Sequence, residues 1–406
     1  MANSFTFVGK IFACKETDNF KPHEKRTFDS GWTKESIKFN AVCGSNRHMV
    51  EQSVLYPKNK EDVTIYTLVK REGDEKSHNE AIPYDDRFDD EIVNAVPQFK
   101  KFVLDSELPN RRKELKSALT AFEDGTITDE TMTKLGVTSI EGCKTAYDKS
   151  CNKRHEFIWE GDFIEYLAKF LTNDKIKDMT WRITGDYALE YNSENDQWYR
   201  KFKVQKIYRA ADDAEITSQA SFIVTFGREA VDDTDYSETK KLHINGFVTQ
   251  YLGKPYKKNC FCPMTFTIDS STDEQAEKRA KFLRDKFTFP AESEADYREY
   301  GIVCDVLDGA QVVEFTEDMM NDEERENVAL GFATFEDIKR DHSSKEIYGD
   351  KVVDIVIVKP LGEYRSSGAV DTAYAAEDVG KPRCDLDEPK YEEVKVFDDV
   401  DDDDEI

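Results

Sequence analysis

Short runs in which apolar and polar residues alternate recur along most of the chain, and they restrict its fold more than any other feature. Glycine, proline, asparagine and aspartate cluster between the runs. Successive side chains of a strand point to opposite faces, so this alternation predicts half-buried strands in antiparallel sheets. The runs lie at residues 5–12, 36–44, 63–69, 179–187, 198–209, 221–226, 240–251 and 261–268.

Three of these runs contain an internal glycine, at Gly9, Gly185 and Gly246. A glycine inside a strand marks a bulge or a sharp coil, which a small closed barrel needs in order to turn a corner. The repeated combination of such a strand with a polar turn and a second, aromatic and basic strand therefore predicts two or three related small barrels in tandem.

Residues 89–171 have a different pattern. Lysine, leucine, glutamate and alanine dominate residues 105–124, and the apolar residues of 162–170 follow helical spacing. Because 406 residues are too many for one ordinary core, we predict a mainly β chain with helical insertions, of the α+β class. The expected parts are a β unit at 1–88, a helical connector or insertion at 89–175, a β unit at 176–235, a β/α unit at 236–365 and a disordered acidic tail at 366–406.

The charge of the chain is strongly acidic, with 57 lysines and arginines against 84 aspartates and glutamates and a formal net charge of −27. This excess argues against coating duplex DNA through bulk charge. Seven of the nine residues 398–406 are acidic, which predicts a disordered tail that docks in a basic groove of this chain or of a partner. The expected partner-binding residues are Asp401, Asp402, Asp403, Asp404, Glu405 and Ile406.

Signatures of catalysis are missing from the sequence. It contains no phosphate-binding GxxxxGK[ST] or GxGxxG loop, and no histidine accompanies a framed nucleophile. Cys260 and Cys262 share one strand face but lack a second ligand pair, so we expect buried thiols and no metal. We therefore predict a protein without enzyme activity or cofactor. A secretory signal and an apolar run of the ~20 residues that span a bilayer are also missing, so we expect a cytoplasmic protein, in the host cytoplasm if viral, without a membrane partner.

Aromatic and basic residues interleave in the run at 198–209. Strand alternation places Tyr199, Lys201 and Lys203 on one face, and assigns the other face, which includes Lys206, to the core. Exposed rings and cations suit single-stranded nucleic acid, whose bases stack on aromatic rings while its phosphates bind lysine and arginine. The alternative is a β-barrel whose aromatic rings form the core and whose cations keep it soluble. The candidate DNA-binding residues are Trp32, Lys34, Arg47, Trp181, Arg182, Tyr187, Tyr199, Lys201, Lys203, Tyr251, Lys254 and Tyr256.

With these glycine-containing strands, the basic strand at 198–209 and the acidic run at 398–406, the chain resembles phage-type single-stranded DNA-binding proteins. The resemblance implies barrels of the OB-fold type. It also implies an acidic tail that recruits replication and recombination proteins and competes with DNA for the basic groove. One departure is the ending Glu405-Ile406, where the familiar bacterial tail ends in Pro-Phe.

The leading hypothesis is a sequence-tolerant protein that protects single-stranded DNA during replication or recombination. Two alternatives fit the same acidic β-rich chain. One is a non-enzymatic structural or protein-interaction protein of a virus, and the other is an inhibitor that mimics DNA through its surface acids.

Overall fold

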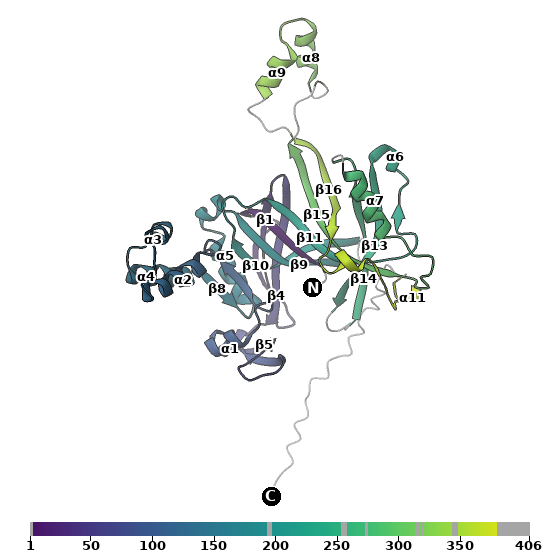
Figure 1. Cartoon of the computed structure of the whole chain (residues 1–406). Helices are drawn as coiled ribbons and strands as arrows, with labels where there is room; N and C mark the ends of the chain where they lie inside the picture. The colour runs from purple at the N-terminus through teal and green to yellow at the C-terminus, as the bar shows by residue number, and fades with distance from the viewer. Residues whose placement is uncertain are drawn as a thin grey trace.

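A computed structural model describes residues 3–192, 197–252, 258–272, 275–312, 317, 320–342 and 348–379. Strands fill the middle of the molecule, a helical module lies to one side, and a helical pair projects beyond the strands (Figure 1). The helical module consists of α2, α3 and α4, and the projecting pair of α8 and α9.

The elements follow one another as sets of strands interrupted by helices. The strands are β1 Ser4–Ala13, β2 His23–Thr27, β3 Trp32–Cys43, β4 Asn46–Pro57, β5 Thr64–Val69, β6 His78–Pro83, β7 Phe102–Asp105, β8 Arg154–Phe157, β9 Trp181–Asn192, β10 Gln197–Arg209, β11 Thr217–Phe226, β12 Val231–Asp232, β13 Lys241–Leu252, β14 Lys258–Asp269, β15 Arg298–Val312, β16 Tyr348–Pro360 and β17 Val370–Asp371. The α-helices are α1 Asp90–Ala95, α2 Arg111–Glu123, α3 Asp129–Leu135, α4 Ile140–Cys151, α5 Glu160–Phe170, α6 Tyr236–Thr239, α7 Ala276–Lys286, α8 Asp322–Ala329, α9 Phe335–His342, α10 Tyr364–Ser367 and α11 Ala376–Val379. Short 3-10 helices are η1 Lys60–Asp62, η2 Tyr84–Phe88 and η3 Asp174–Asp178.

The predicted fold class, a mainly β chain of tandem small antiparallel barrels of the OB-fold type, is wrong. The structure is a mixed α/β protein in which one 15-stranded sheet takes strands from all three expected β units. The sheet is mixed because β10 pairs in parallel with β4 and β7, and β14 pairs in parallel with β16. Alternation shows which side chains share a face, but it does not show which strands become neighbours.

The two halves of the sheet are joined by β1 and β11, which pair antiparallel from Ser4↔Ser221 to Val8↔Thr217. The same stretch of β1 also pairs with β9, and β1 pairs with β3 beyond Gly9. Hydrogen-bonded pairing in the first half therefore runs from β1 through β3, β4, β10 and β9 back to β1. Strands from both ends of the first 209 residues build this half together, with the helical module inserted between them.

Gly185 causes the main irregularity in this half. It pairs with Val204, and the register shifts between Val204 and Lys206, so the glycine marks a bulge as the sequence predicts. The bulge reverses the alternation along β10: Ile207 is buried, whereas Lys206 is half-buried on the same side as exposed Lys203. The assignment of Lys206 to the core face is therefore wrong.

The helices predicted at 105–124 and 162–170 are confirmed as α2 and α5. The apolar face of α5 buries Phe163, Ile164 and Leu167 in the main core. The helical module has a separate small core that includes Leu115, Leu135 and Cys143, so its helices keep their own arrangement beside the sheet.

Candidate nucleic-acid interface

One outward surface gathers many of the predicted residues, and we call it the basic face. Its side chains come from β2, β3, β4, β9 and β10, at alternate positions that point away from the core. The cations of the basic face are Arg26, Lys34, Lys38, Arg47, Lys201 and Lys203, and its carboxylates are Glu24, Glu51 and Glu190. Cations thus outnumber carboxylates here on a chain whose net charge is −27.

The hydrogen-bonded register explains why these side chains meet. Lys34 pairs with Leu55 and Lys38 with Glu51 across β3 and β4, and Lys203 of β10 pairs with Glu51. Lys34, Lys38 and Lys203 therefore line one hollow of about 240 Å³. Its base is polar, because Ser36 and Ser53 lie opposite each other at its centre.

Lys201 balances the carboxylates of the basic face. Its Nζ atom lies 3.2 Å from a Glu51 carboxylate oxygen and 3.4 Å from a Glu190 carboxylate oxygen. Partial burial lowers the pKa of Lys201, but these two carboxylates outweigh it and leave the pKa above its usual value. By contrast, no hydrogen bond or ion pair reaches the ammonium groups of Lys34 and Lys203 from the residues that the structure describes. These two lysines can each donate hydrogen bonds to a phosphate.

Exposed aromatic rings border the basic face at the β2–β3 turn. Phe28 is 36% exposed and Trp32 is 45% exposed. The turn is fixed by hydrogen bonds from Phe28 N to Trp32 O (2.8 Å) and from Lys58 N to Gly31 O (2.8 Å). Gly31 adopts a φ of 79°, which favours glycine. A rigid turn thus presents two rings beside the cations.

Next to the basic face lies a larger hollow of about 740 Å³, which we call the aromatic hollow. Trp32, Leu55 and Tyr66 line it, and the latter two are 58% and 79% exposed. Its lysine and carboxylic acid side chains are Lys100, Asp62 and Glu160. This environment favours a neutral ring over a phosphate.

The predicted site residues divide between surface and core. Trp32, Lys34, Arg47, Tyr199 and Lys203 are exposed, and Lys201 is half-buried. Tyr199 donates a hydrogen bond from its hydroxyl to Gln197 Oε1 at 3.3 Å. Arg182 is exposed on β9, where it lines a separate cleft beneath α2.

Two predicted DNA-binding residues belong to the core instead. Trp181 is fully buried, packs edge-on against Phe170 and donates from Nε1 to Ile176 O at 3.0 Å. Tyr187 is 4% exposed, its ring packs against Phe202 and Phe222, and burial raises the pKa of its hydroxyl to about 12. Neither ring has a face that a base can reach, so the prediction for both residues is corrected.

The remaining predicted residues fall at least partly outside the described part of the chain. Tyr251 lies near the end of β13 and pairs with Asn259, but its side chain is outside the described part of the chain. Lys254, Tyr256 and the acidic residues Asp401 to Ile406 also lie outside the described residues.

Sequence reasoning missed Arg26, Phe28, Lys38 and Tyr66. Arg26 lies over the Phe28 ring, with its guanidinium carbon 5.1 Å from the ring centroid. Strand alternation could have placed Lys38 beside Lys34, four residues earlier on the same strand. Tyr66 comes from the separate β5–β6 hairpin, and no local signal in the sequence connects that hairpin with Trp32.

Comparison of the sequence with models of known protein families gives no match. Comparison with curated proteins gives none either. The chain is assigned to no family. The resemblance to phage-type single-stranded DNA-binding proteins therefore remains a prediction.

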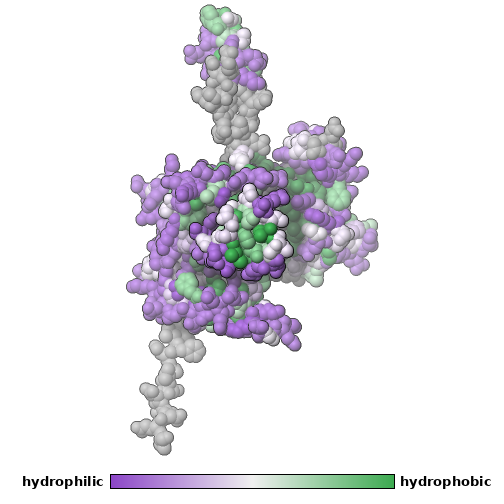
Figure 2. Space-filling model, turned by 60° about the vertical axis from the view of Figure 1, so that its left-hand side comes forward, coloured by the Kyte–Doolittle hydropathy of each residue, from purple (hydrophilic) through white to green (hydrophobic). Residues whose placement is uncertain are grey.

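Two further observations concern other kinds of site. Among the described residues, no cluster of three or more histidine, cysteine, aspartate or glutamate side chains has the arrangement of a metal site. The described helices include none that combines the length and apolar character required to cross a bilayer. Hydrophilic residues cover most of the surface that Figure 2 turns toward the viewer, and less polar residues gather near its centre.

Proposed function

We propose that this protein binds single-stranded DNA along the basic face, without strong sequence preference, during replication or recombination in the cytoplasm. The observation that carries the proposal is the position of Lys34 and Lys203 on one face with the exposed rings of Phe28 and Trp32. Cations of this kind bind backbone phosphates, and exposed rings stack on unpaired bases.

The preference for a single strand follows from the aromatic hollow. In a duplex the bases are stacked and paired, so their faces cannot reach Trp32 or Tyr66. A single strand can turn its bases into the hollow while its phosphates stay on Lys34 and Lys203. The acidic net charge of the chain repels bulk duplex DNA and leaves the basic face as the place of contact.

The acidic run at 398–406 gives this protein a second role in the proposal. A segment with seven acidic residues in nine suits a basic pocket on a replication or recombination protein, and it also competes with DNA for the basic face. Its role is proposed from the sequence alone.

Fluorescence anisotropy of a labelled oligonucleotide of about thirty thymidines, within the range that one or two such sites cover, tests the proposal. We expect binding at low salt that weakens steeply as salt rises, because bound phosphates release counterions. Duplex of equal length should compete poorly, and an RNA oligonucleotide in the same assay measures the preference for DNA. Flat anisotropy at low salt would refute the proposal.

A second candidate function is protein interaction, and the pair α8–α9 favours it. This pair projects from the sheet (Figure 1) and carries Leu330 and Phe332, which are 60% and 78% exposed. Four acids, Asp322, Glu323, Glu324 and Glu326, lie on α8 beside them. A stable assembly with no DNA affinity would support this function over the first.

A further inference from the structure

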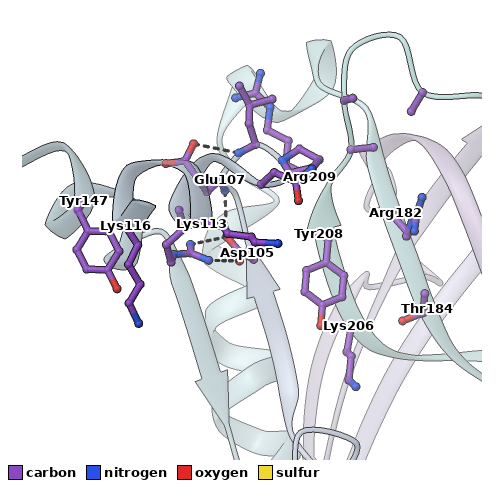
Figure 3. A pocket seen from close by; sticks show the side chains of 17 residues that line it. Asp105, Glu107, Lys113, Lys116, Tyr147, Arg182, Thr184, Lys206, Tyr208 and Arg209 are labelled. Carbon is purple, nitrogen blue, oxygen red and sulfur yellow. Dashed lines mark hydrogen bonds and ion pairs between the residues drawn. The ribbon is translucent and has the colours of Figure 1, made fainter. Parts of the chain in front are cut away.

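A second basic cleft lies between α2 and the outer faces of β9 and β10 (Figure 3). Its volume is about 990 Å³, and we call it the module cleft because the helical module forms one wall. Lys113 and Lys116 come from the helical side, whereas Arg182, Lys206 and Tyr208 come from the strands. The cations that line it are Arg112, Lys113, Lys116, Arg182, Lys206 and Arg209, and the carboxylates are Asp105 and Glu107.

The two carboxylates of the module cleft are already engaged. Asp105 accepts hydrogen bonds from both terminal nitrogens of Arg112, at 3.0 and 3.1 Å. Glu107 forms an ion pair with Lys153 at 3.3 Å. Arg112 also donates to Ser150 O at 2.7 Å, so this guanidinium is fixed at the cleft wall. The carboxylates therefore do little to neutralise the other cations.

Three cations of the module cleft have no acidic partner in the described part of the chain. Within the described residues, no hydrogen bond or ion pair engages the charged groups of Lys113, Lys116 or Arg182. Burial is the main cause that lowers the pKa of Lys206; the nearby Arg154 charge adds to it, and Glu156 opposes both in part. An anion in the cleft would favour the charged form of Lys206.

The module cleft continues the basic face along β10. Lys203, on the basic face, and Lys206, in the cleft, point to the same side because the bulge opposite Gly185 lies between them. Three residues of strand span about 10 Å. A strand of nucleic acid that leaves Lys203 therefore reaches Lys206 without crossing the sheet.

We propose that the module cleft binds the sugar-phosphate backbone of the same single strand, beyond the nucleotides held on the basic face. This inference rests on the proposed function and extends its site to a longer oligonucleotide. Tyr147 and Tyr208 line the cleft as well, and they offer rings to the sugars or bases of the added nucleotides.

The test is the double variant Lys113→Ala/Lys116→Ala, measured with short and long oligonucleotides of about eight and thirty thymidines. Both lysines are exposed on α2, so the fold should be retained. We expect unchanged affinity for the short oligonucleotide and roughly tenfold weaker binding of the long one. The slope of log affinity against log salt should decrease by about 1.4, because each phosphate contact to a single strand contributes about 0.7.

The matched control is Lys278→Ala/Lys281→Ala, which removes two exposed lysines from α7 on the other half of the sheet. It should behave as the wild type with both oligonucleotides. The inference would be overturned if the wild type binds both oligonucleotides and the Lys113→Ala/Lys116→Ala variant loses equal affinity for both. It would also be overturned if the variant loses no affinity for the long one. Failure of the wild type to bind either length would instead refute the proposed function.

The competing occupant of the module cleft is an acidic peptide, such as the run at 398–406. Deleting Asp398 to Ile406 in the wild type and in the Lys113→Ala/Lys116→Ala variant distinguishes the two. If the lysine changes leave binding of the long oligonucleotide intact but abolish the effect of the deletion, the cleft holds the acidic run and the inference is wrong.

Discussion

Gly185 and Lys203 approach so closely that a Cβ atom at position 185 would lie 2.0 Å from the Lys203 carbonyl oxygen. The backbone nitrogen of Gln205 lies 3.0 Å from the same point. Only glycine therefore allows β9 to pass the bulge of β10. This contact sets the direction of Lys203 and Lys206, so the proposed nucleic-acid interface depends on a residue outside it.

Gly185→Ala should consequently destabilise the protein and misalign the interface. A backbone atom cannot rotate away from the added methyl group, so the strands must separate, and we expect a decrease of about 2–3 kcal/mol in the free energy of unfolding. Urea denaturation measures it. Gly362→Ala is the matched control, because a Cβ atom there meets nothing within 4 Å and the backbone is not left-handed. Equal stability of the two variants would contradict the role of Gly185.

Lys201 should contribute to DNA binding chiefly by neutralising its neighbours. Lys201→Ala leaves Glu51 and Glu190 unpaired in the hollow, where their charges repel phosphates. We therefore expect it to weaken DNA binding more than Lys203→Ala, which removes one cation without freeing the carboxylates that Lys201 engages. Adding Glu51→Gln to Lys201→Ala should restore part of the affinity in anisotropy titrations at constant salt. If Lys203→Ala proves the more harmful change, the phosphate contact of Lys203 outweighs the neutralising role of Lys201, and this prediction is wrong.

Trp32 should contribute to DNA binding through contact with bases and not with phosphates. Stacking of a base on an aromatic ring contributes about 1–3 kcal/mol. Trp32→Ala should therefore lower the affinity for thymidine oligonucleotides roughly tenfold. An abasic oligonucleotide of the same length should bind both proteins equally, because its phosphates still meet the basic face. Phe332→Ala is the control, since this exposed residue follows α8 in the chain, and α8 lies away from β4 and β10 (Figure 1). Equal losses with both oligonucleotides would show that Trp32 supports the fold rather than stacking.

Local patterns in the sequence predicted individual strands and helices well, and pairing poorly. The strand at 36–44 and the helix at 162–170 are present because their side-chain periodicities match one buried face. Pairing of Ser4 with Ser221 joins residues far apart in the chain, and no periodicity encodes it. The same limit explains Trp181 and Tyr187: alternation places both on one face of a strand, but only the neighbouring strands decide that this face is the core. The shift at the bulge similarly moved Lys206 outward.

His48 should make stability depend on pH. Its imidazole is fully buried, stacks on Phe7 with ring centroids 4.3 Å apart, and has Nε2 2.6 Å from Ser218 Oγ. Burial lowers its pKa to about 4, against about 6.5 in the unfolded chain. The unfolded state therefore binds the proton first as pH falls, and the free energy of unfolding should decrease by about 3 kcal/mol between pH 6.5 and pH 4.

Denaturation of the wild type and of a His48 variant at pH 7 and pH 4.5 measures this effect. The two proteins must be compared because carboxylates also titrate in that range. His48→Asn should lose part of the pH dependence that the wild type shows. His78→Asn serves as control, since His78 is exposed on β6 beside Asp74 and Glu80. Identical pH profiles for His48→Asn and the wild type would assign the dependence to the carboxylates.

Deletion of Asp398 to Ile406 tests whether the acidic run competes with DNA. Its seven acids and the phosphates of a single strand would seek the same cations, Lys34 and Lys203 among them. The truncated protein should therefore bind a thymidine oligonucleotide more tightly, and the difference should vanish at high salt, where screening weakens the intramolecular contact. Replacing the seven acids by serine and asparagine, with the length kept, should tighten binding as much as deletion does. If deletion tightens binding but the neutral replacement does not, the segment acts by occupying space, and electrostatic competition is excluded.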